Sequence, residues 1–162
     1  TLLASSAASD VYKRQISGDG GAQMNIQELA TAHALETPVI LCIFNNTYLG
    51  NVKQMQKMFY NKRYSSTCLR YSRSCNRQCR IDGTCTGGDY VPDFVKLAEA
   101  FGALGFRASD TAELSEALDK AAEAKRPAVI DCKIDKDEFV LPMLPPGGSI
   151  DDIITEIRGG EI

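Results

Sequence analysis

The sequence has a single histidine and no long apolar run among its 162 residues. That histidine, His33, excludes a histidine-rich zinc site and any Ser/His/Asp triad that does not use His33 itself. The longest apolar run spans residues 39–44, whereas a membrane-spanning helix needs about 20 apolar residues. We therefore expect no membrane partner.

Neither sign of charge is in large excess either. The sequence has 18 lysines and arginines and 21 aspartates and glutamates, which gives a net charge of −3. This mildly acidic balance argues against a general nucleic-acid-binding protein. A hydrophobic content of 44% is that of an ordinary globular chain, and the length suffices for one domain with its own core. Six cysteines without a signal-like segment favour a reducing compartment, so we expect a cytoplasmic protein.

The two ends of the chain differ from its middle. The first 15 residues are small and polar, and the stretch SSAASDVYKRQ resembles the translation of a common sequencing adapter. We interpret residues 1–15 as a non-native or disordered leader, the alternative being a natural flexible terminus. Residues 16–162 then form the native part, which we expect to begin partway into a domain. Residues 139–162 are a tail that is first rich in proline and glycine, with a short acidic helix expected after Ile150.

Apolar residues recur at helical spacing in four segments, within residues 26–33, 49–59, 94–101 and 114–121. We expect His33, on the first of these helices, to be packed rather than catalytic. Short apolar runs at residues 39–44, 103–108 and 128–134 are typical of strands. Strands that alternate with helices imply parallel strands joined by crossovers. The predicted fold class is therefore α/β, a parallel sheet flanked by helices.

Residues 60–90 fall outside this alternation, and we interpret them as a loop insertion. They are polar, have no apolar period, and contain Cys68, Cys75, Cys79 and Cys85 among several arginines. Four thiolates could bind zinc, which would stabilise a loop that has no core of its own. The spacing lacks a C-x-x-C pair, however, and free thiols on a surface loop are the alternative.

Polar side chains lie at two predicted strand ends, one directly before Asp19 and one at the end of residues 39–44. Asp19 lies in a Gly-Asp-Gly-Gly turn, and Asn46 follows one helix and one strand further along the chain. Because ligands of open parallel sheets bind outside the carboxyl ends of the strands, we expect these two side chains to lie next to each other there. A carboxylate, an amide oxygen and a backbone carbonyl suit Mg²⁺, which usually completes its shell with waters and substrate phosphates. The pair therefore predicts a magnesium site beside a phosphorylated cofactor.

Glycines and a helix start support an anion at the same place. Gly18, Gly20 and Gly21 would let the backbone approach a cofactor without a Cβ clash. The helix after Gly21 would point its first N–H groups toward an anion. Either motif alone is explained by ordinary turn chemistry, and only their pairing at two strand ends is specific.

The residues of these two motifs resemble those of a known family. Gly18-Asp19-Gly20 followed by Asn45-Asn46, with the aspartate and the second asparagine 27 positions apart, resembles the thiamine-diphosphate-binding motif of thiamine-dependent enzymes. The stretches QMNIQELATA, YLGNVKQMQKMFYNKRYSST, PDFVKLAEAFGA and PMLPPGG are similar to the large catalytic subunit of acetolactate synthase (acetohydroxyacid synthase). The resemblance runs from about residue 16 to the end, and it implies a thiamine-diphosphate-binding fold that is incomplete at its N-terminus.

The resemblance also implies a ligand set. Mg²⁺ would be bound by the side chains of Asp19 and Asn46 and by the backbone carbonyl of Tyr48, and it would bridge to the cofactor diphosphate. The residues implied in cofactor binding belong to the same two turns and to the helix starts that follow them: Gly18, Asp19, Gly20, Gly21, Met24, Asn46, Tyr48, Leu49, Gly50, Asn51 and Val52.

The implied activity is the condensation of pyruvate, after loss of CO₂, with a second pyruvate or with 2-ketobutyrate. This reaction belongs to branched-chain amino-acid biosynthesis, and the cofactor carries its chemistry. The resemblance further implies FAD in the full-length parent, a homodimer or tetramer through the full-length chain, and pairing with a regulatory small subunit. The family's activating glutamate belongs to an N-terminal domain of a partner subunit, which this sequence does not contain. We therefore assign no catalytic residue and expect the 162-residue chain alone to be inactive.

Two positions depart from the family pattern, and two alternative functions stay open. Many members have Trp where this sequence has Met55, whose flexible thioether could fill a similar volume, and often Met where it has the polar Asn51. The alternatives are another thiamine-dependent 2-ketoacid decarboxylase, oxidase or ligase, and a zinc-binding interaction module built on the cysteine-rich loop.

Overall fold

A computed structural model describes residues 13–70 and 91–156. The chain divides into two compact units. The first comprises residues 1–45 and 92–134, and the second comprises residues 46–91 and 135–162. Within the two described ranges, no helix combines the length and the apolar character that a bilayer span requires.

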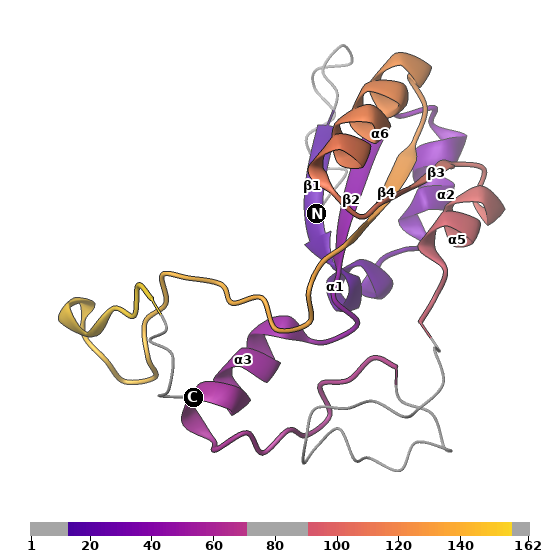
Figure 1. Cartoon of the computed structure of the whole chain (residues 1–162). Helices are drawn as coiled ribbons and strands as arrows, with labels where there is room; N and C mark the ends of the chain where they lie inside the picture. Colours follow the sequence, from indigo (N-terminus) through magenta and orange to yellow (C-terminus); the bar gives the residue numbers. More distant parts are fainter. Residues whose placement is uncertain (1–12, 71–90, 157–162) are drawn as a thin grey trace. The chain divides into compact units, whose positions relative to one another are not determined.

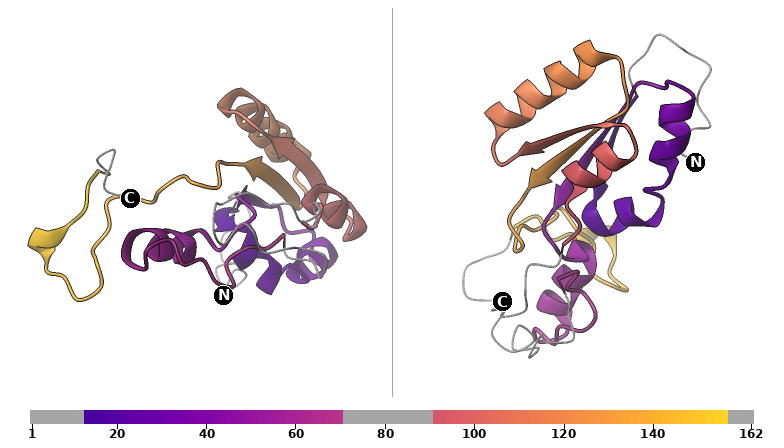
Figure 2. Two further views of the ribbon diagram at one scale, coloured as in Figure 1. Left: turned by 60° about the horizontal axis from the view of Figure 1, so that its bottom comes forward. Right: turned by 90° about the vertical axis from the view of Figure 1, so that its right-hand side faces the viewer.

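The first unit is a parallel four-stranded sheet with the strand order β1-β2-β4-β3. Helix α6 covers one face, and α2 and α5 lie on the other (Figures 1 and 2). This arrangement confirms the predicted α/β class. The strands are β1 (Lys13–Gly18), β2 (Val39–Asn45), β3 (Leu104–Ala108) and β4 (Ala128–Lys133), and the helices are α1 (Asp19–Met24), α2 (Glu28–Ala34), α5 (Phe94–Ala100) and α6 (Thr111–Ala124).

The core lies around β4, the strand between β2 and β3. Its residues from Ala128 to Cys132 are all buried, as expected for a parallel strand that is covered on both faces. On the α6 side, Ile40 and Ile130 pack against the alanines Ala117 and Ala121 of the helix. The small alanine side chains allow the helix to pack closely against the strands.

Aspartates define the starts of α5 and α6. Asp93 accepts hydrogen bonds from the backbone N–H groups of Val95 and Lys96, and Asp110 accepts one from Glu113. These side chains satisfy N–H groups that have no partner within the helix. The helices predicted within residues 94–101 and 114–121 are therefore confirmed.

The predicted first helix is broken into α1 and α2. Because α2 starts anew at Glu28, its buried residues are Leu29 and Ala32, and not the continuous face expected within residues 26–33. His33 was expected to be packed rather than catalytic, and the residue is more than one third exposed. Its ring nevertheless lies against Gly102, where a Cβ would be 2.7 Å from the ring atom Cε1.

Strand β1 begins within the residues that were expected to form the leader. Residues 13–15, assigned above to the leader, pair in parallel register with residues 39–41 of β2. Their side chains are polar, but their backbone groups are satisfied by the neighbouring strand. Residues 1–12 lie outside the described residues, and their origin from an adapter stays a prediction.

Among its described residues, the second unit contains α3 (Gly50–Phe59) and the short 3₁₀ helix η1 (Ile150–Asp152). The helix at this position was predicted correctly, but its buried face was not. Lys53 and Gln54 are each only 7% exposed, whereas the apolar Val52 and Phe59 are 47% and 37% exposed. Both polar side chains are buried because they bind the tail, as described below.

The tail itself is largely irregular. The acidic helix expected after Ile150 is a single 3₁₀ turn with a capping box between Ser149 and Asp152, and an isolated antiparallel bridge joins Met143 to Ile154.

Candidate functional site

The first predicted motif lies at the carboxyl end of β1. Gly18 is the last residue of the strand, and Asp19 is the first residue of α1 rather than part of a turn. Asp19 is only 1% exposed. Its Oδ1 accepts a hydrogen bond from the N–H of Gly20 at 2.9 Å, and its carbonyl accepts one from Nε2 of Gln23 at 3.1 Å. The carboxylate is therefore held in a defined orientation at the strand end.

The other members of the first motif differ in their surroundings. A Cβ at Gly21 would lie 3.0 Å from Oγ of Ser17, whereas a Cβ at Gly18 would meet nothing within 4 Å. Gly20 is half-buried, and Met24, at the end of α1, is 74% exposed. A bound cofactor would therefore find an open surface at Gly18 and Met24.

The second motif lies at the end of β2, and the side chains of its two asparagines form different hydrogen bonds. Asn45 is buried, and its amide donates a 2.8 Å hydrogen bond to Oδ1 of Asp131 in β4. Oδ1 of Asn46 accepts the N–H of Tyr48 at 2.9 Å. Between them, Thr47 has a left-handed φ of 63°. The chain thus leaves the sheet through a tight turn that is closed by the Asn46 side chain.

Tyr48 is held in this turn from a second direction. It forms an isolated antiparallel bridge with Cys68. The two hydrogen bonds of that bridge come from its flanking residues: Leu49 N–H donates to the carbonyl of Thr67 at 2.8 Å, and Leu69 N–H donates to the carbonyl of Thr47 at 3.0 Å.

Gly50 leaves room for the side chain of Asn46 where α3 begins. A Cβ at this position would lie 2.8 Å from Nδ2 of Asn46, so any larger residue would displace the asparagine side chain. Leu49 precedes the helix, and Asn51 and Val52 occupy its exposed first turn. All of the predicted cofactor residues in this segment therefore lie in the turn or in the first turn of α3.

The donor chemistry of the two motifs fits Mg²⁺. Asp19 offers a buried carboxylate, Asn46 an amide oxygen and Tyr48 a backbone carbonyl, all of them hard oxygen ligands. Because Gly50 has no Cβ, the side-chain amide of Asn46 fits beside it without a clash. Asp19 belongs to the first unit, and Asn46 and Tyr48 belong to the second, so their joint binding of one ion stays a prediction.

The zinc alternative gains no support from the described residues. Residues 13–70 and 91–156 contain no group of three or more His, Cys, Asp or Glu side chains that could hold a metal. Cys68 is a half-buried cysteine. Cys75, Cys79 and Cys85 lie outside the described residues.

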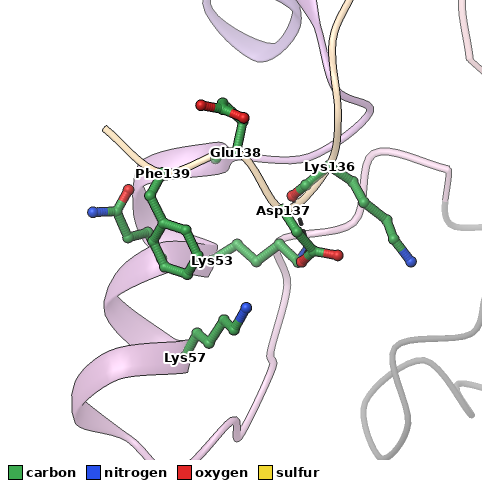
Figure 3. Close-up of a pocket in the computed structure, with 8 residues that line it drawn as sticks. Lys53, Lys57, Lys136, Asp137, Glu138 and Phe139 are labelled. Atoms are coloured by element: carbon green, nitrogen blue, oxygen red, sulfur yellow. Dashed lines mark hydrogen bonds and ion pairs between the residues drawn. The ribbon is translucent and has the colours of Figure 1, made fainter. Parts of the chain in front are cut away.

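A cluster around Lys53 was missed by the sequence analysis. Its ammonium nitrogen lies 2.6 Å from Oδ1 of Asp137 and 2.8 Å from the carbonyl oxygen of Lys136. It also lies 4.6 Å from the ring centroid of Tyr48 and 5.9 Å from that of Tyr64. Figure 3 shows Lys53 extending from α3 toward Asp137. The sequence did not indicate this cluster, because the hydrogen-bond partners of Lys53 lie more than 80 positions away.

The charges of this cluster act on its acidic groups. Burial opposes ionisation of Asp137, but the hydrogen bond and charge of Lys53, with the charges of Lys136 and Lys57, lower the pKa of Asp137 below its ordinary value. The pKa of Tyr64 is raised by burial and by the negative charge of Asp137. At neutral pH, Asp137 is therefore the anion that faces Lys53.

Comparison with known proteins defines the class. Residues 4–132 match the family described as "Thiamine pyrophosphate enzyme, C-terminal TPP binding domain". The chain belongs to this family of thiamine-pyrophosphate-binding domains.

Within that class, the chain is similar to large subunits of acetolactate synthase. It is 40% identical over 143 residues to the probable large subunit of Methanocaldococcus jannaschii, covering 88% of this chain and 21% of that protein. It is 40% identical over 141 residues to the isozyme 3 large subunit of Escherichia coli K12, covering 85% and 21%. With the large subunit of Corynebacterium glutamicum the identity is 39% over 153 residues, covering 94% and 22%. The chain thus spans about a fifth of the length of these relatives.

A solved structure confirms the fold. The thiamine diphosphate-dependent 4-hydroxybenzoylformate decarboxylase of Rhodococcus jostii RHA1 superposes with a TM-score of 0.65 at 23% identity, covering 83% of this chain and 22% of that one.

Proposed function

We propose that the chain is the cofactor-binding C-terminal part of an acetolactate synthase large subunit that uses thiamine diphosphate and Mg²⁺. One observation carries the proposal: the two polar motifs follow the carboxyl ends of neighbouring parallel strands, β1 and β2, whose register pairs Gly18 with Phe44. This is the edge of an open parallel sheet at which ligands bind. The similarity to three large subunits supports the same conclusion.

In this proposal the chain holds and orients the cofactor. The side chains of Asp19 and Asn46 and the carbonyl of Tyr48 would bind Mg²⁺, which would in turn hold the diphosphate. Gly50 would keep the Asn46 amide in place, and the helix starts beyond both turns would line the cofactor. The cofactor, when bound, supplies the carbon that takes up a 2-ketoacid and accepts the electrons released on decarboxylation.

The activity proposed for the longer parent protein is the joining of decarboxylated pyruvate to a second pyruvate or to 2-ketobutyrate. This places the parent in branched-chain amino-acid biosynthesis in the cytoplasm, with FAD as a further bound group and with assembly into a homodimer or tetramer beside a regulatory small subunit. The similarity to the acetolactate synthase large subunits supports these features. The 162-residue chain alone is proposed to be inactive, because the resemblance assigns the activating glutamate to a partner subunit.

A second candidate is another thiamine-dependent 2-ketoacid enzyme. The fold likeness to the 4-hydroxybenzoylformate decarboxylase favours it, because decarboxylation without carbon–carbon bond formation would need the same cofactor cradle. The two candidates differ in their products, which are an acetohydroxyacid in the first case and an aldehyde in the second.

Two measurements test the proposal. Calorimetry of the 162-residue chain with thiamine diphosphate and Mg²⁺ should show binding that is lost in Asn46→Ala. A chimera in which residues 16–162 replace the matching segment of the E. coli isozyme 3 large subunit should form acetolactate from pyruvate. A folded chimera that releases only acetaldehyde would favour the second candidate. A folded chain that binds no cofactor would reject both.

A further inference from the structure

Lys53 is a charged side chain buried in the second unit. The residue is 7% exposed, and its side chain is 9% exposed. A buried ammonium is strongly unfavourable unless it is paired and hydrogen-bonded. Here an anion, Asp137, a carbonyl, that of Lys136, and an aromatic face, that of Tyr48, surround it. An ammonium is attracted to the face of an aromatic ring, and more strongly where water is excluded.

The neighbouring residue Gln54 binds the same segment of the tail. Its Nε2 donates to the carbonyl of Val140 at 3.1 Å, and its Oε1 accepts the N–H of Val140 at 2.9 Å. The side-chain amide therefore pairs with Val140 as a backbone neighbour would. Nε2 also lies 3.0 Å from Sδ of Met143. Two consecutive buried polar residues of α3 thus bind residues 136–143.

Lys57, one helical turn after Lys53, provides a contrast on the same helix. Its ammonium lies 4.6 Å from the ring centroid of Phe139, and the residue is only half-buried. Figure 3 shows both lysines beside the segment that carries Asp137 and Phe139. The two lysines differ in the rings that they contact. Within residues 13–70 and 91–156, the ammonium of Lys53 lies over Tyr48 and Tyr64, outside the tail, whereas that of Lys57 lies only over Phe139 of the tail.

We propose that Lys53 is a positioning residue with two linked tasks. It fastens residues 136–140 to α3 through Asp137 and the Lys136 carbonyl. Through the ring of Tyr48 it holds the turn of residues 46–48 in the shape that binds Mg²⁺. The first task is independent of the proposed function, and the second rests on it.

The variants that separate the two tasks are Lys53→Met and Asp137→Asn. Lys53→Met removes the ion pair and the contact with Tyr48 while keeping the length of the side chain. Asp137→Asn removes only the ion pair and leaves the ammonium over the ring. Lys57→Met is the matched control on the same helix. Lys53→Arg keeps a cation over the ring and should restore most of what Lys53→Met loses.

The docking of the tail is measured by amide hydrogen exchange of residues 136–140 in the full 162-residue chain without cofactor. Lys53→Met and Asp137→Asn should each speed exchange there by about tenfold or more, as expected for the loss of a partly buried charged hydrogen bond. Lys57→Met should change it by less than about threefold, the effect of one weak, half-exposed cation–ring contact.

The hold on the turn is measured by binding of Mn²⁺, followed by the electron paramagnetic resonance of the free ion in the presence of thiamine diphosphate. Lys53→Met should weaken Mn²⁺ binding by about tenfold, within the range for loss of a desolvated cation–ring contact. Asp137→Asn should weaken it by less than about threefold, and Lys53→Arg should bind nearly as the parent chain does.

Several outcomes would overturn the inference. Unchanged exchange in Lys53→Met would reject the docking task. Equal loss of Mn²⁺ binding in Lys53→Met and Asp137→Asn would show that the tail, and not the ring of Tyr48, transmits the effect. If the parent chain binds no Mn²⁺, the proposed function and the second task fail together, while the exchange data still decide the first task. If Lys53→Met does not fold by circular dichroism, exchange in Asp137→Asn decides the first task, and a loss of about tenfold in Mn²⁺ binding in Asp137→Asn or in Lys53→Arg would reject the second.

Discussion

The side-chain amide of Asn45 donates a 2.8 Å hydrogen bond to the carboxylate of Asp131, and both residues are buried, at 1% and 0% exposure. The second carboxylate oxygen of Asp131 lies 3.0 Å from Nζ of Lys133 and 3.5 Å from Nε of Arg107. This oxygen lacks a well-directed hydrogen bond, so the two cations compensate it mainly through charge. The pair ties the end of β2 to β4, immediately before the turn that contains Asn46.

Removing this carboxylate should be costly. In Asp131→Ala, the Asn45 amide loses its acceptor and the two cations lose their counter-charge, so we expect a loss of about 3 kcal/mol in the free energy of unfolding. Urea denaturation of the 162-residue chain measures it. Glu116→Ala is the control, because Glu116 forms an exposed i,i+4 pair with Lys120 and such pairs contribute little. Equal stability of the two variants would show that the buried pair does not stabilise the sheet.

Gly50→Ala should separate stability from metal binding. Alanine is ordinarily the better residue in a helix by about 1 kcal/mol, but here its Cβ would lie 2.8 Å from Nδ2 of Asn46. The asparagine must move, so we expect unfolding by urea to change little and binding of Mg²⁺ with thiamine diphosphate to be strongly weakened in calorimetry. Wild-type binding by Gly50→Ala would exclude Asn46 as a ligand.

The sequence predicted the elements whose signals are local. The runs at β2 and β4 and the aspartate before α5 determine those elements by apolar content and by capping, and the structure contains all three. The start of β1 was missed because residues 13–15 are polar, and only their pairing with β2 makes them a strand. Local patterns carry no information about such pairing.

The candidate site divides in the same way. Asp19 and Asn46 could be singled out because a strand end and a turn are visible in the sequence. Lys53 could not, because the hydrogen-bond partners of its ammonium, Lys136 and Asp137, lie 83 and 84 positions away. Helical periodicity assigned the buried face of α3 to apolar residues, and the distant tail reversed that assignment. The spacing of residues along the sequence cannot predict contacts between residues so far apart.

The pKa of one buried strand cysteine, Cys42, should depend on the other, Cys132. Cys42 and Cys132 lie on the same face of neighbouring strands. A hydrogen bond from Cys132 lowers the pKa of Cys42 to about 7, against the opposing effect of burial and with help from Arg14. Cys132→Ala should therefore raise the pKa of Cys42 toward 9.0, its ordinary value. Titration of ¹³Cβ-labelled cysteine by NMR measures it, with Cys68→Ala as the control that leaves Cys42 unchanged.

Docking of the tail should be lost in acid. Although burial opposes its ionisation, the folded-state pKa of Asp137 lies below its ordinary value of 3.8, because Lys53 binds the carboxylate and Lys136 and Lys57 add positive charge. A depressed carboxyl pKa contributes stability that is complete above the unfolded pKa and disappears as the pH falls through the folded one. Amide exchange of residues 136–140, corrected for its intrinsic pH dependence, should therefore be slow at pH 5 and should accelerate only below about pH 3.8. Asp137→Asn should abolish this acid step, since its side chain does not titrate. A step that persists in Asp137→Asn would assign the transition to another carboxyl group and would remove the ion pair with Lys53 as the force that docks the tail.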